Sequence, residues 1–266
     1  MLRIAMHGAA GRMGRAIVRA ISEDESLALV AALDREGSDA LGRDAGELAQ
    51  VGPIGIALVA DRTALRGADV VIDFSSPAAT AATARACAAS STPMVIGTTG
   101  LDADADAAIG ELAAKAAVVV APNTSVGVNV LFHLAAEAAR LLGPDFDAEI
   151  VEMHHKKKVD SPSGTAVRLA ERVAAAKGLG RESFVHGRSG QVGARPAAEI
   201  GIMTLRGGDV IGEHTLVLAG PGERIELTHR AHDRSLFALG ALRAARWAAA
   251  QKTPGRYDMA DVLAIR

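Results

Sequence analysis

Residues 2–14 read Leu2-Arg3-Ile4-Ala5-Met6-His7-Gly8-Ala9-Ala10-Gly11-Arg12-Met13-Gly14, and this stretch decides the fold of the chain. The first six residues predict a short strand, the glycines predict a tight turn, and apolar residues at helical spacing predict a helix over 15–21. Glycines at such a turn let the backbone approach a pyrophosphate, whose charge the start of the helix stabilises. Ala10 and Met13 replace the later glycines of the strict dinucleotide-binding spacing, so the pattern alone also fits a tight structural turn.

The segments that follow alternate between apolar strands and helices as far as Asn123. We expect strands at 27–33, 69–74, 93–97 and 118–121, helices at 77–90 and 104–117, and irregular structure at 35–67. Such alternation is typical of a doubly wound parallel sheet. The sequence therefore predicts an α/β protein whose first domain is a Rossmann-type parallel sheet.

The pattern changes after Asn123, where strands begin to follow one another directly. We expect helices at 128–142, 164–176 and 235–250, a strand at 148–153, and several strands across 198–231. Glycine-rich segments at 207–209 and 220–222 predict hairpin turns between these later strands. Hairpins imply a second, α+β domain with a mixed, largely antiparallel sheet, and the last helix is expected to pack back on the first domain.

Composition excludes several classes of partner and location. The 266 residues carry a net charge of −2 and only one Trp, one Tyr and five Phe, which argues against a nucleic-acid partner. The sequence contains no long uncharged apolar run, so we expect neither a membrane span nor a membrane partner. The N-terminus lacks the basic, apolar and small-residue zones of a signal peptide. The single cysteine, Cys87, excludes an internal disulfide framework and fits a reducing, cytoplasmic location.

Residues at the ends of the predicted parallel strands indicate a nicotinamide dinucleotide cofactor. Asp34 ends the second strand about 20 residues after the glycine turn, where an acid should meet the adenosine ribose hydroxyls. Arg35 beside it can accept the extra phosphate of NADP, so the pair fits NADH or NADPH. Two further loops follow later strands and could line the nicotinamide: Gly97-Thr98-Thr99-Gly100 and Ala121-Pro122-Asn123-Thr124.

A second candidate site lies in the run Glu152-Met153-His154-His155-Lys156-Lys157-Lys158-Val159-Asp160-Ser161-Pro162-Ser163-Gly164-Thr165. Gly164 and Thr165 open a predicted helix, whose N–H groups, with the Thr hydroxyl, suit a carboxylate. His154 is a candidate proton donor, and His155 and Lys158 are candidates for further anion contacts. A solvated basic loop is the plain alternative. A zinc site is disfavoured, because adjacent histidines on a strand point to opposite faces and no Cys cluster or H-E-x-x-H run is present.

These motifs closely resemble the dihydrodipicolinate reductases along essentially the whole chain. The resemblance is carried by residues 8–14, Asp73-Phe74-Ser75, the loops at 97–100 and 121–129, the His-Lys run at 152–165, and Arg206-Gly207-Gly208-Asp209-Val210-Ile211-Gly212-Glu213-His214. It implies reduction of a small cyclic dicarboxylate, 4-hydroxy-tetrahydrodipicolinate, by NADH or NADPH in the diaminopimelate route to lysine. It also implies a dinucleotide-binding domain of residues 1–126 and 235–266, and a substrate-binding and oligomerisation domain of residues 127–234 that builds a homotetramer.

The resemblance also assigns roles to individual residues. It makes His154 the proton donor and Lys158 the second catalytic residue, and places His155, Gly164 and Thr165 at the substrate. Nucleotide positions fall on Gly8, Ala9, Ala10, Gly11, Arg12, Met13, Asp34, Arg35, Gly97, Thr98, Thr99, Ala121, Pro122, Asn123 and Thr124. Asp34 stands where many members have Glu, which leaves the preference between NADH and NADPH open.

Two other functions compete with this interpretation. Another two-domain reductase, such as a semialdehyde dehydrogenase, would need an activated cysteine, and Cys87 in its Ala-rich setting does not resemble one. A redox-sensing nucleotide-binding regulator would need a DNA-binding element with a basic face, and the sequence contains no such element.

Overall fold

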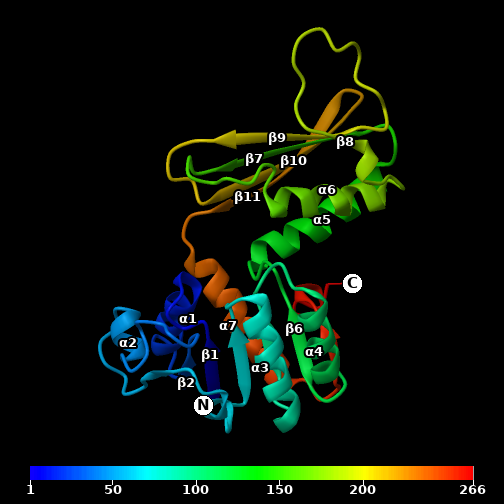
Figure 1. The fold of residues 1–266 in the computed structure, drawn as a ribbon. Coiled ribbons are helices and arrows are strands. Elements are labelled where there is room, and N and C mark those ends of the chain that lie inside the picture. The colour runs from blue at the N-terminus through cyan, green and yellow to red at the C-terminus, as the bar shows by residue number, and fades with distance from the viewer. Residues whose placement is uncertain (266) are drawn as a thin grey trace. The chain divides into compact units, whose positions relative to one another are not determined.

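The computed structural model describes residues 1–265, and the chain divides into two compact units. The first unit is Met1–Val126 with Ser235–Arg266, and the second is Gly127–Arg234 (Figure 1). The last helix of the chain thus belongs to the first unit. Within residues 1–265, no helix is both long enough and apolar enough to cross a bilayer.

A parallel sheet of seven strands, in the order β12-β6-β5-β4-β1-β2-β3, forms the centre of the first unit. Its strands are β1 (Leu2–His7), β2 (Leu27–Leu33), β3 (Leu58–Val59), β4 (Val70–Asp73), β5 (Met94–Ile96), β6 (Ala117–Val120) and β12 (Gly255–Tyr257). The strand order reverses at β1 and β4, which are neighbours although β2 and β3 come between them in the sequence. Ligands of such sheets bind beyond the carboxyl ends of the strands at this reversal.

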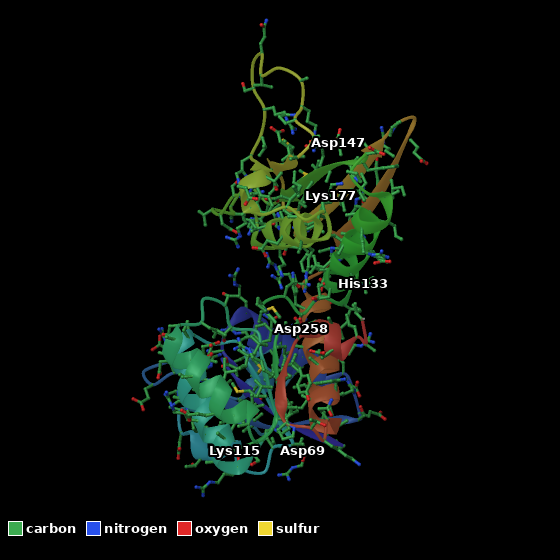
Figure 2. The ribbon with its side chains drawn as sticks, turned by 90° about the vertical axis from the view of Figure 1, so that its right-hand side faces the viewer. Asp69, Lys115, His133, Asp147, Lys177 and Asp258 are labelled. Carbon is green, nitrogen blue, oxygen red and sulfur yellow. The ribbon has the colours of Figure 1, made fainter. Side chains whose placement is uncertain are left out.

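Helices cover both faces of this sheet. The helices α1 (Arg12–Ser22) and α7 (Ser235–Ala250) pack on one face, and α3 (Pro77–Ser90) and α4 (Ala103–Ala113) pack on the other (Figure 1). Strands buried on both faces are apolar at every position instead of alternating, which is why 27–33 and 70–72 are continuous apolar runs. Asp258 is the N-cap of a short helix, α8 (Met259–Val262), and forms a capping box with Asp261 (Figure 2).

The predicted strands at 2–7 and 27–33 and the helices at 77–90 and 235–250 are confirmed to the residue. The helix after the glycine turn begins at Arg12, earlier than predicted, and a Cβ at Gly14 would lie 2.2 Å from the Gly8 carbonyl oxygen. The helix predicted at 104–117 ends at Ala113, because β6 already begins at Ala117. The segment 35–67 is not wholly irregular: it holds β3, α2 (Ala45–Leu48) and the 3-10 helix η1 (Arg62–Leu65).

The second unit has a sheet of five strands in the order β11-β10-β7-β9-β8. Its elements are α5 (Val126–Leu142), β7 (Asp147–His154), α6 (Gly164–Ala176), the 3-10 helix η2 (Arg181–Ser183), β8 (Phe184–Val185), β9 (Ile200–Arg206), β10 (Gly212–Gly220) and β11 (Glu223–Ala231). The apolar sides of α5 and α6 pack against one face of the sheet. Lys177, after α6, donates hydrogen bonds to the carbonyls of Gly143 and Phe146, which join this helix to the segment leading into β7 (Figure 2).

The predicted hairpin at 207–209 is wrong, whereas β10 and β11 do form a hairpin around 220–222. The strands β9 and β10 do not pair, because β7 lies between them, parallel to β9 and antiparallel to β10. The segment 207–209 therefore crosses the end of β7, where Gly207 N–H donates to the His154 carbonyl at 2.9 Å. The sheet is mixed, as predicted: the β10–β11 and β7–β10 pairs are antiparallel, and the β7–β9 and β8–β9 pairs are parallel.

Candidate active site

The glycine turn of the first unit is packed so tightly that Gly8 and Gly14 have no room for a side chain. Gly8 has φ +81°, and a Cβ there would lie 2.3 Å from the carbonyl oxygen of Phe74 at the end of β4. Gly11 is the N-cap of α1, and no side chain among the described residues caps the helix there. The first turn of α1 also contains no acidic residue. The start of α1 is therefore suited to an anion such as a pyrophosphate.

Asp34 and Arg35 follow directly from β2, beside this turn. The Asp34 carboxylate accepts hydrogen bonds from the N–H groups of Ala10, at 2.9 Å, and of Arg35, at 2.9 Å. Asp34 is half-buried and Arg35 is exposed. The carboxylate thus fixes the glycine turn and Arg35, and each of its oxygens keeps further lone pairs for a ligand hydroxyl.

The two loops at the ends of β5 and β6 come to the same edge of the sheet as the glycine turn. Thr98 is buried, and its hydroxyl donates to the Asp73 carboxylate at 2.8 Å and accepts from Ser75 N–H at 2.9 Å. Thr124 is also buried, and its hydroxyl donates to the carbonyl of Phe237 in α7 at 2.7 Å. These hydroxyls anchor the loops, so the backbones of the loops are the parts suited to contact a cofactor.

Asp73 is the centre of this anchoring, although sequence reasoning gave it no role. Its buried carboxylate accepts hydrogen bonds from the hydroxyls of Ser75, Thr80 and Thr98. It also lies 2.8 Å from Nδ1 of buried His7, the last residue of β1. One carboxylate therefore joins the carboxyl ends of β1, β4 and β5, which surround the glycine turn.

In the second unit, a buried carboxylate and a histidine lie on the same face of β7. Residues at every second position of a strand share a face, and Glu152 and His154 follow Ala148 and Ile150 on the side covered by α5 and α6. Glu152 Oε2 lies 2.5 Å from His154 Nδ1. Arg206 at the end of β9 donates hydrogen bonds to both carboxylate oxygens, with Nη1 2.9 Å from Oε2 and Nη2 3.0 Å from Oε1.

The same carboxylate also holds the start of α6. Ser163 N–H donates to Glu152 Oε1 at 3.0 Å, and Ser163 caps α6 by accepting the N–H of Ala166 at 3.1 Å. Gly164 and Thr165 are the first two residues of this helix, and Gly164 is exposed. Glu152 thus contacts both the predicted proton donor, His154, and Ser163, which directly precedes the predicted carboxylate-binding residues Gly164 and Thr165.

Hydrogen bonds of Lys158 and Asp160 hold the Lys loop between β7 and α6. Lys158 Nζ lies 2.8 Å from Asp160 Oδ2, and this hydrogen bond lowers the pKa of the Asp160 carboxyl. Arg206 Nη2 donates to the Asp160 carbonyl at 2.7 Å, which ties the loop to the end of β9. His155 is half-buried, and no described residue pairs with its buried Nδ1. The loop is therefore ordered around Lys158 and is not a freely solvated basic run.

Burial and charge shift the titration of this cluster. Burial lowers the pKa of His154, an effect that the hydrogen bond and charge of Glu152 oppose only in part. Burial raises the pKa of Glu152, but hydrogen bonds from Arg206, His154 and Ser163 reverse this and leave it below the ordinary value. His214 of β10 packs edge-on against His154, with ring centroids 5.1 Å apart, and burial lowers its pKa to about 3. Glu152 is thus ionised and His214 neutral at physiological pH.

Sequence reasoning missed Glu152 and Arg206 and left His214 undecided. The Glu-x-His spacing on a predicted strand was the available signal for Glu152, since it places both side chains on one face. Nothing local pointed to Arg206, which reaches Glu152 across 54 positions of the sequence. In residues 1–265, no group of three or more His, Cys, Asp or Glu side chains is arranged to hold a metal ion.

Comparisons with known proteins match nearly the whole chain. The family described as dihydrodipicolinate reductase, N-terminus, matches residues 2–124, and the family described as dihydrodipicolinate reductase, C-terminus, matches residues 127–263. A 4-hydroxy-tetrahydrodipicolinate reductase of Anaeromyxobacter dehalogenans is 54% identical over 270 residues, which cover 100% of this chain and 99% of the relative. A protein of the same name from Myxococcus xanthus is 50% identical, with coverage of 100% and 99%.

Solved structures agree with the sequence matches. A dihydrodipicolinate reductase from Paenisporosarcina sp. with bound dipicolinate is 26% identical and has a TM-score of 0.78, covering 97% of each chain. An amine dehydrogenase from Mycobacterium smegmatis, 13% identical, has a TM-score of 0.58 and covers 96% of this chain and 94% of its own. The second likeness concerns the fold alone.

Proposed function

Because the chain belongs to the dihydrodipicolinate reductase family, we propose that His154 and Lys158 carry out the proton and charge chemistry of its reaction. The reaction is the NADH- or NADPH-dependent reduction of 4-hydroxy-tetrahydrodipicolinate, with loss of water, in the diaminopimelate route to lysine. The observation that carries the assignment is the buried Glu152–His154 pair, whose carboxylate also holds the start of α6.

The cofactor is assigned to the carboxyl edge of the parallel sheet. When bound, NADH or NADPH supplies the hydride. The turn from Gly8 to Met13 and the start of α1 suit its pyrophosphate, because Gly8 and Gly14 leave no space for side chains and the helix start is uncapped. Asp34 would accept ribose hydroxyls and Arg35 would pair with the phosphate of NADPH. The backbones of 97–99 and 121–124 would line the nicotinamide.

The substrate is a cyclic dicarboxylate, which needs anion-binding groups. The N–H groups at Gly164 and Thr165, where α6 begins, would hold one carboxylate. His155 and Lys158 would contact the substrate's anionic groups from the preceding loop. The dipicolinate bound to the Paenisporosarcina reductase is a dicarboxylate of the same class, which supports this assignment.

Loss of the ring hydroxyl as water leaves a conjugated imine in the substrate. Addition of hydride to this system drives negative charge toward the ring nitrogen. Protonated His154 would donate the proton that quenches this charge, and the ammonium of Lys158 would stabilise it as it develops. Contacts of the carboxylates with the start of α6 hold the ring in place, so that binding energy is used for orientation.

The uncovered face of the second unit's sheet is assigned to assembly of a homotetramer. The helices α5 and α6 cover only one face. The other face carries apolar side chains at alternate strand positions, and Leu205 on this face is 50% exposed. These side chains are Val151, Met153, Met203, Leu205 and Val217. An apolar area of this kind typically marks a protein–protein interface, and burying it between copies would remove it from water.

The properties of Cys87 favour this chemistry and a cytoplasmic location. Burial raises the pKa of its thiol to about 12, so it cannot act as the thiolate nucleophile of a semialdehyde dehydrogenase. A lone, buried thiol is typical of proteins from a reducing compartment. The net charge of −2 and scarce aromatic residues disfavour a nucleic-acid partner.

The function is tested by following the absorbance of reduced nicotinamide after freshly prepared cyclic imine is added to enzyme with NADPH or NADH. We expect oxidation of the cofactor that depends on both the imine and the enzyme. A reaction without imine measures background oxidation. If neither cofactor is oxidised in an imine-dependent manner, the proposed function is wrong.

A further inference from the structure

Glu152 makes contacts that a purely structural carboxylate would not need. Of its two oxygens, Oε2 faces His154 Nδ1 at 2.5 Å and Arg206 Nη1 at 2.9 Å. The other oxygen, Oε1, accepts from Ser163 N–H at 3.0 Å, from Arg206 Nη2 at 3.0 Å and from the Thr204 hydroxyl at 3.2 Å. The side chain is completely buried. Two of these partners, His154 and Ser163, flank the Lys loop proposed to bind the substrate, and Arg206 also donates to the Asp160 carbonyl within that loop.

The contact with His154 determines which ring nitrogen can act on a substrate. An ionised carboxylate only accepts hydrogen bonds, so a 2.5 Å contact requires a proton on His154 Nδ1. That proton is used in the contact, which leaves Nε2 as the nitrogen that can give a proton away. Gly212 keeps space beside this atom, because a Cβ built there would lie 2.9 Å from Nε2.

We infer that Glu152 is a positioning residue that fixes the ring of His154 so that Nε2 delivers the proton, and that it aligns the start of α6 with this histidine. The inference rests on the proposed function, in which His154 is the proton donor. The guanidinium of Arg206 binds both oxygens of the Glu152 carboxylate and so holds it in one orientation. Glu152 also stabilises the imidazolium form of His154 by charge.

Three side chains act on the protonation of His154 by their charge, and a fourth packs against its ring. Glu152 of β7 favours the imidazolium, whereas Lys158 of the loop and Arg206 of β9 oppose it. His214 of β10 contacts the ring edge-on and stays neutral, because burial lowers its pKa to about 3. Loss of the Glu152 charge therefore removes the group that favours the acid form and leaves two opposing cations.

The test compares Glu152→Gln with Glu149→Gln in the full-length enzyme. Glu149 lies on the same strand and pairs with Arg188 and Arg195, but it points to the opposite face. We expect Glu152→Gln to lower kcat by about 100-fold, the low end of general acid catalysis, with KM for the imine and the Kd for NADPH within about threefold. In the pH profile of kcat, the descending limb, where kcat falls as the pH rises, should move to lower pH. Glu149→Gln should leave kcat and this limb unchanged.

A second variant separates charge from packing. Glu152→Asp keeps the charge, and we expect it to retain more kcat than Glu152→Gln and to keep the limb nearer its wild-type position. If Glu152→Gln fails to fold, the kcat and pH profile of Glu152→Asp, compared with those of the wild type, still test the inference. The inference would be overturned if Glu152→Gln kept the wild-type kcat and pH profile. It would also be overturned if both variants lost the same amount of kcat and the descending limb of the pH profile did not move. Turnover of the imine by the wild type shows separately that the proposed function holds.

Discussion

The ammonium group of Lys158 lies 2.8 Å from the carboxylate of Asp160, two residues along the same loop. Lys158 is about one-fifth exposed, whereas more than half of the Asp160 side chain is exposed. Asp160 is therefore a counter-ion that solvent can reach, and a substrate carboxylate would compete with it for the same ammonium. The proposed charge-stabilising group is thus held in place before substrate arrives.

Removing this counter-ion should strengthen binding of a dicarboxylate. An exposed ion pair is worth roughly 0.2–1 kcal/mol, so Asp160→Asn should lower the Kd for dipicolinate by up to about fivefold. Calorimetric titration measures this directly. Asp209→Asn, which removes the same charge from an exposed position on the neighbouring 207–209 segment, is the control and should change the Kd less. Unchanged or weaker binding in Asp160→Asn would show that Asp160 does not compete for Lys158.

Lys158 itself should be needed for turnover and not for cofactor binding. Lys158→Ala should lower kcat by roughly 10²–10⁴-fold if its charge stabilises the reacting system. The Kd for NADPH, measured by fluorescence, should stay the same, since the cofactor is assigned to the other unit. Lys157→Ala, which removes an exposed neighbouring lysine, is the matched control. Near-normal turnover of Lys158→Ala would exclude Lys158 from the mechanism.

Arg35 should distinguish the two cofactors. Arg35→Ala should weaken NADPH by roughly 1.5–3 kcal/mol, the value of a hydrogen bond to a charged group, and leave NADH nearly unchanged. Asp34 is less suited to this test, because its carboxylate also holds the N–H of Ala10 and its loss would loosen the glycine turn for both cofactors. Fluorescence titration of both cofactors measures the difference, with Arg66→Ala as the control. Equal losses for NADH and NADPH would place the phosphate elsewhere.

Asp73 should contribute strongly to stability. Asp73→Ala would leave buried His7 and three hydroxyls without their acceptor, so we expect the free energy of unfolding to fall by roughly 3–5 kcal/mol. Asp104→Ala removes an exposed pair with Arg85 and should cost less than about 1 kcal/mol. Denaturant unfolding of both variants provides the comparison. Similar losses in the two variants would contradict the role given to the Asp73 network.

Much of the fold could be predicted because it depends on local patterns. Apolar runs bounded by turns located β1 and β2, and Pro77 located the start of α3. The order of β7, β9 and β10 could not be predicted in this way, because a glycine-rich segment after a strand looks the same whether it closes a hairpin or crosses another strand. Only the pairing of β7 with both neighbours, far apart in the sequence, distinguishes the two.

The candidate site shows the same division between local and distant information. The segments that carry it were recognised from motifs, including 8–14 and 152–165. The directions of individual side chains were not, because they depend on distant partners. Thr98 lies in a predicted cofactor loop, yet its hydroxyl is held by Asp73. Arg206 directly precedes a predicted turn, yet its guanidinium binds Glu152.

The most direct test of the account is the turnover of His154→Asn, measured with saturating NADPH and the cyclic imine, together with its affinity for dipicolinate. His186→Asn, which changes an exposed histidine in the loop after β8, is the control. We expect kcat to fall by roughly 10²–10⁴-fold, while the Kd for dipicolinate stays within about threefold of wild type. Near-wild-type turnover of His154→Asn would show that His154 is not the proton donor.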